Sequence, residues 1–131
     1  MTLEPASTAT PSADSGYRVR ILDLSGGAEE GITEEVSGFA DVAAANAFAR
    51  AYVRDSLDRC RTRGADARAV LDAWFAFGED AVVLGAGDEA WRSAAELADF
   101  AARPGTPRER DWRALDPHRP PRPSVVVSPR A

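Results

Sequence analysis

Residues 39–61 constrain the fold of this chain more than any other stretch. Apolar side chains recur there at steps of three and four residues, the spacing that aligns them along one side of an α-helix. The apolar positions are Val42, Ala45, Phe48, Ala49, Tyr52, Val53, Leu57 and Cys60. Asp41 is a suitable N-cap, and Gly64 suits the left-handed conformation that follows a helix end. We predict one helix, about 30 Å long at about 1.5 Å per residue, that packs its apolar side on a sheet.

Two short strands are predicted before this helix. Residues 17–24 alternate between apolar and charged side chains, the pattern of a half-buried strand, and residues 32–39 form a second, shorter strand. Residues 25–31 between them have the composition of a turn. Together these segments predict an antiparallel hairpin.

Side-chain pairing favours one register for this hairpin. When paired residue numbers add up to 55, Val19 lies opposite Val36 and Arg20 lies opposite Glu35. Antiparallel sheets favour such pairs, apolar on the inner face and oppositely charged on the outer face. A shift by one residue would place Val36 on the arginine side, so we predict this register.

Three further elements are predicted beyond the long helix. Asp66 can cap a second helix, whose inward residues are Val70, Leu71, Trp74 and Phe75. Residues 81–84 form an apolar run that fits either a short strand or a buried connection. Asp88 can cap a third helix, which residues 103–105 (Arg-Pro-Gly) end.

These elements predict an α+β domain with two layers. An N-terminal β-hairpin packs on the long central helix, two shorter helices complete the core, and residues 81–84 offer a third short strand. Residues 1–15 are polar and predicted to be disordered, and residues 16–103 form the single domain. Residues 104–131 contain seven of the nine prolines, so we predict a largely extended tail rich in proline and arginine.

The charge distribution limits the partners that this chain can have. All sixteen basic residues are arginine, a bias typical of a GC-rich, bacterial-like composition, and the net charge is −5. Residues 1–102 carry nine arginines against eighteen acidic residues, and residues 103–131 carry seven against three. An acidic body lacks the clustered positive charge that a phosphate backbone requires. We therefore do not expect a nucleic-acid partner for the body.

Cysteine and histidine usage bears on redox chemistry and location. Cys60 is the single cysteine and His118 the single histidine, so no internal disulfide or Cys/His zinc site is expected. Because Cys60 lies on the apolar side of the helix, we interpret it as a buried thiol and not a reactive one. The chain shows no signal-sequence pattern and no run of about 18 apolar residues. We expect a cytoplasmic protein without a membrane partner.

Two motifs that suggest chemistry are interpreted as structural. Residues 82–90 contain G-x-G-x-x-A after a possible strand, the order found in dinucleotide-binding turns. Asp88 and Glu89, however, would place negative charge where a pyrophosphate lies. A proline-rich segment follows the predicted helix, where a dinucleotide-binding unit would have its next strand. The acidic pairs at 79–80 and 88–89 have no evident third metal ligand or nucleophile beside them. We expect no catalytic residue, cofactor or metal.

The proline-rich segment 117–123 is a candidate interaction motif. Its overlapping P-x-x-P spacings favour a polyproline II conformation, which can dock in an aromatic groove. The candidate residues are Arg119, Pro120, Pro121, Arg122 and Pro123. A solvated tail without a partner is the other interpretation. Trp112 and Leu115 have side chains that can pack back on the body.

Two functions of different classes follow from these observations. The first is a non-catalytic cytoplasmic domain that binds another protein or a second copy of itself. The second is a small-ligand-binding or enzymatic domain with a pocket between hairpin and helices. The pocket residues considered are Arg18, Arg20 and the acidic pairs at 79–80 and 88–89. A pocket lined by an arginine and carboxylates would favour the second function, whereas contact of the basic tail with nucleic acid is a third, weaker option.

Overall fold

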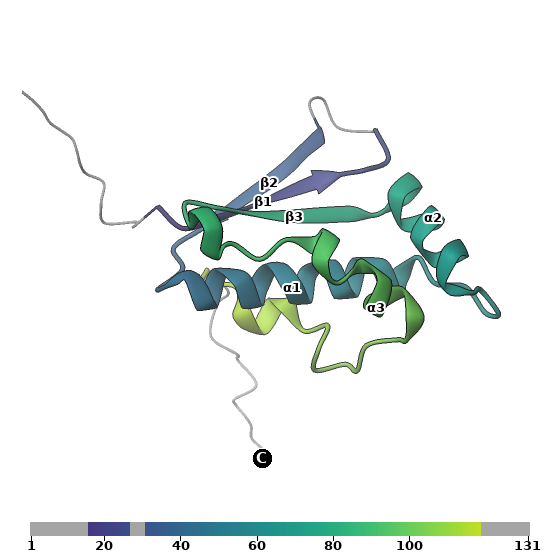
Figure 1. The fold of residues 1–131 in the computed structure, drawn as a ribbon. Coiled ribbons are helices and arrows are strands. Elements are labelled where there is room, and N and C mark those ends of the chain that lie inside the picture. The colour runs from purple at the N-terminus through teal and green to yellow at the C-terminus, as the bar shows by residue number, and fades with distance from the viewer. Residues whose placement is uncertain (1–15, 27–30, 119–131) are drawn as a thin grey trace, which may run out of the picture.

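A three-stranded antiparallel sheet and three helices form the fold (Figure 1). The computed structural model describes residues 16–26 and 31–118. The strands are β1 (Arg18–Asp23), β2 (Ile32–Ser37) and β3 (Glu79–Leu84), arranged in the order β2-β1-β3. The helices are α1 (Val42–Arg59), α2 (Ala67–Phe77) and α3 (Leu97–Ala102). The α+β class is therefore confirmed, and residues 81–84 belong to a strand.

The predicted hairpin register is confirmed. Val19 pairs with Val36 and Arg20 pairs with Glu35. Arg20 Nε and Nη2 both donate to the Glu35 carboxylate, at 3.0 and 2.8 Å. The register shifts by one residue after Ile21, where a bulge forms. The central strand β1 thus carries apolar residues to one face and arginines to the other.

Helix α1 begins as predicted and ends earlier. The Asp41 carboxylate accepts a hydrogen bond from the Ala44 amide at 2.8 Å, which caps the first turn. The last helical residue is Arg59, and Cys60 is the C-cap. The prediction that Gly64 follows the helix end is wrong, because a tight turn already forms at Cys60, whose amide donates to Leu57 O.

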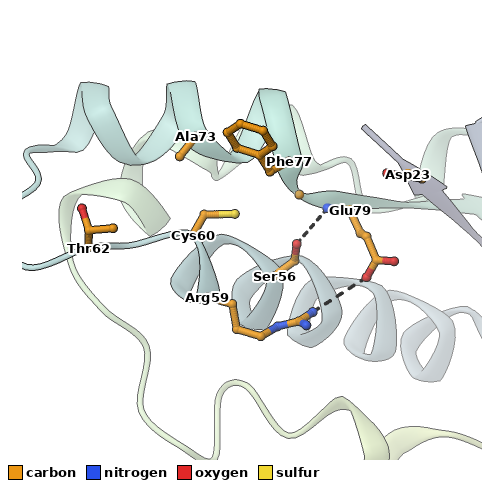
Figure 2. A pocket seen from close by; sticks show the side chains of 9 residues that line it. Asp23, Ser56, Arg59, Cys60, Thr62, Ala73, Phe77 and Glu79 are labelled. Atoms are coloured by element: carbon orange, nitrogen blue, oxygen red, sulfur yellow. Dashed lines mark hydrogen bonds and ion pairs between the residues drawn. The ribbon is translucent and has the colours of Figure 1, made fainter. Parts of the chain in front are cut away.

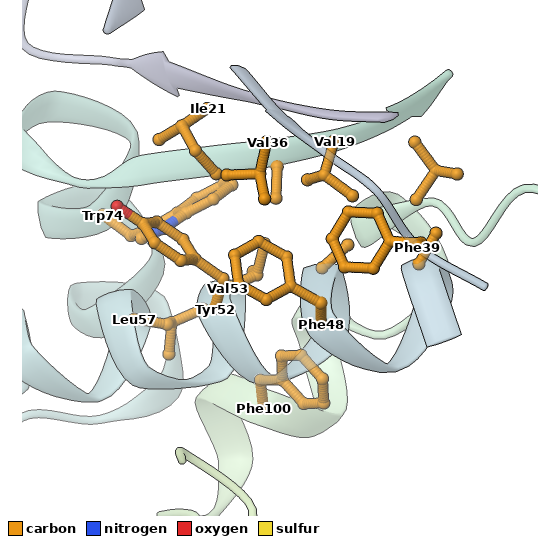
Figure 3. Close-up of a cluster of buried hydrophobic side chains, with 14 of the residues drawn as sticks. Val19, Ile21, Val36, Phe39, Phe48, Tyr52, Val53, Leu57, Trp74 and Phe100 are labelled. Carbon is orange, nitrogen blue, oxygen red and sulfur yellow. The ribbon is translucent and has the colours of Figure 1, made fainter. Parts of the chain in front are cut away.

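The core lies between the sheet and α1 (Figure 3). Sheet residues such as Val19, Ile21 and Val83 meet a row of aromatic and aliphatic side chains from α1. Phe48 lies at the centre of this row, with its ring centroid 5.3 Å from that of Phe39. Another buried ring, Phe100 of α3, packs on the other side of α1 (Figure 3).

Helix α2 packs by a single narrow side. Asp66 caps it by accepting from the Ala69 amide at 2.9 Å, as predicted. Val70 and Trp74 are buried, but the prediction that Phe75 points inward is wrong, because its side chain is 56% exposed. Successive residues of a helix point about 100° apart. Because Trp74 points into the core, Phe75 points away from it.

The predicted helix from Asp88 to the arginine at 103 is wrong in its first half. The chain forms a 3₁₀ turn, η4 (Gly87–Glu89), an extended stretch, a second turn η5 (Ser93–Ala95), and only then α3. Asn46 of α1 supplies the reason. Its side chain donates to Glu89 O at 2.9 Å and accepts from the Trp91 amide at 2.8 Å. In a continuous helix capped at Asp88, Glu89 O would instead accept from the amide four residues later, and the Trp91 amide would donate to the cap. The two bonds to Asn46 therefore hold this backbone in another arrangement.

Residues 104–118, here called the C-terminal segment, lie on the side of α1 away from the sheet (Figure 1). A 3₁₀ turn, η6 (Trp112–Leu115), places the Trp112 ring 4.8 Å from that of Tyr52. Trp112 Nε1 donates to Asp55 at 3.2 Å. Leu115 remains 41% exposed. The proposed interaction residues 119–123 and the lead 1–15 lie outside the described residues.

Candidate functional site

One cavity of the described chain lies where α1, α2 and the sheet meet (Figure 2). We call it the α1–α2 hollow. Its volume is about 620 Å³, within the range of about 300–1,000 Å³ typical of small-molecule sites. The lining residues are Asp23, Ser56, Arg59, Cys60, Thr62, Ala73, Phe77, Gly78 and Glu79.

Glu79 is the most firmly held polar residue of this hollow. Tyr52 donates its phenolic hydrogen to Glu79 Oε1 at 2.9 Å. The backbone amide of Glu79 donates to Ser56 Oγ at 2.8 Å. Burial, and then the hydrogen bond to Glu79, raise the pKa of Tyr52 well above its ordinary value, so the phenol remains a donor. The carboxylate therefore has one oxygen fixed by the protein.

Arg59 supplies the positive charge of the hollow. Its Nη2 lies 3.7 Å from Glu79 Oε1 (Figure 2), and its Nε lies 3.3 Å from Asp55 Oδ2. The ion pair with Asp55 joins two residues four apart on the same side of α1. Because the Arg59 side chain is largely exposed, solvent screens both pairs and each contributes little to stability. Its guanidinium is accordingly available to a ligand.

The remaining wall is apolar. Ala73 and Phe77, four residues apart on α2, face the hollow from one side (Figure 2), and Cys60 faces them from the end of α1. Phe77 is 74% exposed, an unusual position for a phenylalanine. Burial raises the pKa of the Cys60 thiol, although Arg59 opposes this effect. The thiol is therefore neutral at pH 7, and this wall offers contact area without charge.

Gly78 creates the junction between α2 and β3. A Cβ at this position would clash with the Trp74 ring and its carbonyl oxygen. The absence of a side chain lets the chain leave α2 and enter β3 directly, with Leu24 N donating to Gly78 O at 2.9 Å. The hollow therefore depends on this glycine as well as on its lining side chains.

The pocket residues expected from the sequence separate in the structure. Glu79 lines the α1–α2 hollow, while Asp80 lines a second groove of about 470 Å³ between β3 and residues 85–94. Burial raises the pKa of Asp80. Asp88 and Glu89 are exposed on η4. Arg59 also lines the α1–α2 hollow, although it was not among the pocket residues expected from the sequence.

The second candidate surface is the face of the sheet that no helix covers, here called the open sheet face. Cross-strand pairing places nine residues on it in three rows. They are Ser37, Arg18 and Leu84; Glu35, Arg20 and Val82; and Ile32, Leu22 and Asp80. Solvated faces of antiparallel sheets are usually polar, whereas four of these nine residues are aliphatic.

No family model, curated protein or solved structure matches this chain. The site is therefore interpreted from its own chemistry. Among residues 16–26 and 31–118, no cluster of three or more histidine, cysteine or acidic side chains could hold a metal ion. In the same residues, no helix is long and apolar enough to cross a membrane.

Proposed function

We propose that this chain is a non-catalytic protein-interaction domain and that the open sheet face binds a second copy of it. The observation that carries the proposal is the aliphatic character of a face that α1, α2 and α3 all leave uncovered (Figure 1). Val82, in the middle row on the edge strand β3, is 36% exposed. Exposed apolar patches on sheets mark sites of association.

Charge on this face favours a second copy over an unrelated surface. Arg18 and Arg20 lie on the central strand, and Glu35 and Asp80 lie on the two flanking strands. A twofold rotation can therefore place acidic residues of one copy near arginines of the other, as a self-complementary interface requires.

The number of residues on the open sheet face sets the expected affinity of the dimer. Stable complexes use about 20–30 residues on each side, and the open sheet face has nine. We therefore expect a weak dimer that forms and dissociates with concentration. The single thiol at Cys60 suits a reducing cytoplasm, which we propose as the location.

Sedimentation velocity over a range of concentrations tests this proposal. We expect the wild-type sedimentation coefficient to rise with concentration up to about 1 mM, the range of a weak complex, and the Val82→Glu variant to remain monomeric. Arg20 lies opposite Val82, so the new carboxylate is tolerated in the monomer. Leu115→Glu, at a similarly exposed residue away from the sheet, is the matched control. A wild-type protein that stays monomeric throughout would rule out the dimer.

A further inference from the structure

In the α1–α2 hollow an apolar wall lies beside a cationic hydrogen-bond donor, Arg59, and an anionic acceptor, Glu79. Arg59 and Glu79 both line the hollow, and Tyr52 donates to Oε1 of the Glu79 carboxylate. Arg59 Nη2 lies 3.7 Å from the same oxygen. A ligand here would therefore meet a cationic donor and an anionic acceptor within a few ångströms.

This arrangement discriminates among charged ligands. Glu79 would attract a simple cation, but Arg59 would repel it. Arg59 would attract a simple anion, but Glu79 would repel it. A molecule that carries a carboxylate and an ammonium on the same carbon atom can satisfy both, because the carboxylate accepts from Arg59 and the ammonium donates to Glu79. Its apolar part would lie on Ala73 and Phe77. The exposed ring of Phe77 would lose solvent contact on binding, which favours a large apolar group.

We propose that the α1–α2 hollow binds a zwitterionic α-amino acid with a large apolar side chain. Arg59 binds the carboxylate of the ligand, Glu79 binds its ammonium group, and Phe77 covers its side chain. Tyr52 fixes the Glu79 carboxylate before the ligand arrives, so little ordering is needed on binding. This site is separate from the open sheet face, and its occupancy does not require a dimer.

Isothermal titration calorimetry of the full chain with three probes tests the ligand class. The probes are L-phenylalanine, phenethylamine, which lacks the carboxylate, and 3-phenylpropionate, which lacks the ammonium. We expect L-phenylalanine to bind at least tenfold more tightly than either analogue, a difference of about 1.4 kcal/mol. Equal affinity for all three probes, or no binding of L-phenylalanine up to about 10 mM, would overturn the proposal.

Variants assign the binding to the hollow. Arg59→Gln and Glu79→Gln should each weaken L-phenylalanine binding at least tenfold, and Phe77→Ala should weaken it similarly. Glutamine at position 79 retains an oxygen that can accept from Tyr52, so the fold is expected to persist, which far-ultraviolet circular dichroism checks. Arg68→Gln, an exposed arginine of α2 outside the hollow, is the control. Unchanged affinity in Arg59→Gln would show that any binding occurs elsewhere.

Discussion

Phe48 and Phe75 are chemically identical side chains that the structure uses in opposite ways. Phe48 is buried in the centre of the core, in contact with aromatic rings from two other parts of the chain. Phe75 is largely exposed on α2 and touches mainly the Trp74 ring. The two residues therefore provide a matched pair for measuring what burial contributes.

Phe48→Ala should lower the free energy of unfolding by about 3–5 kcal/mol, because it removes a large buried side chain and leaves a cavity. Phe75→Ala should lower it by less than about 1 kcal/mol, since most of this ring is already in water. Urea denaturation monitored by circular dichroism measures both values. Similar losses in the two variants would contradict the assigned burial.

Glu96 links stability to pH. Both of its carboxylate oxygens accept from Arg50, at 2.6 and 2.8 Å, and Trp91 Nε1 donates to it at 2.7 Å. The Arg50 hydrogen bonds are the main cause of a pKa below the ordinary 4.5. A carboxyl group whose pKa is lower in the folded state stabilises the fold above its unfolded pKa, and this contribution disappears as pH falls through the folded pKa.

Glu96→Gln should therefore be less stable than the wild type at pH 7, by about 1 kcal/mol because solvent screens the half-exposed Arg50. The difference should shrink steadily as pH falls below 4.5, the ordinary pKa of the group. Urea denaturation at a series of pH values between 7 and 3 provides the test. A difference that stays constant across this range would show that the Arg50 pair does not depend on charge.

At the scale of elements, Asn46 determines the path of the chain after β3. One side chain on α1 holds both Glu89 and Trp91 through their backbone groups. The residues between η4 and η5 are consequently extended, although the sequence from Asp88 to residue 95 includes several alanines and a good N-cap. Tertiary hydrogen bonds here override local helix propensity.

Asn46→Ala should release this stretch and cost about 1–3 kcal/mol, because it leaves the part-buried Trp91 amide without its partner and removes the donor to Glu89 O. The Trp91 amide should exchange with solvent markedly faster, as measured by hydrogen exchange. Asn46→Asp is the control, since its carboxylate can still accept from Trp91 while losing the donor to Glu89. Equal protection of the Trp91 amide in wild type and Asn46→Ala would refute this role.

At the scale of the whole molecule, α1 is covered on both sides. The sheet packs on its apolar side, and the C-terminal segment packs on the side that carries charges. Asp58 accepts from the Gly105 amide at 2.7 Å, and Asp55 accepts from Arg110 at 2.9 Å. Arg54 is only 2% exposed, and its guanidinium lies 4.5 Å from the centre of the Phe100 ring.

Ending the chain after residue 103 should therefore lower the free energy of unfolding by more than about 3 kcal/mol, comparable to the loss of a packed tryptophan. Trp112→Ala should reproduce part of this loss, whereas Leu115→Ala should change stability by less than about 0.5–1 kcal/mol. Thermal and urea denaturation of the three variants measure these effects. An unaltered stability of the shortened chain would show that the C-terminal segment is not part of the folded unit.

Local rules predicted several features of this protein well. The caps at Asp41 and Asp66 and the pairing of Arg20 with Glu35 depend on residues close in sequence or on simple alternation. The burial of Arg54 and Asp58 was not predictable, because it depends on a segment about fifty residues away. The role of Arg59 in the α1–α2 hollow was missed for the same reason. Its neighbours there come from α2 and β3.

The sequence by itself therefore determined the two hairpin strands, their register and the helix that organises the core, because periodicity and capping act within a few residues. Only the tertiary structure decided which faces of those elements are covered. The same helix buries both its apolar and its charged side, and the chain after β3 is extended where its local sequence favours a helix. Long-range hydrogen bonds and packing set these outcomes, since their free energies exceed the small differences in local propensity.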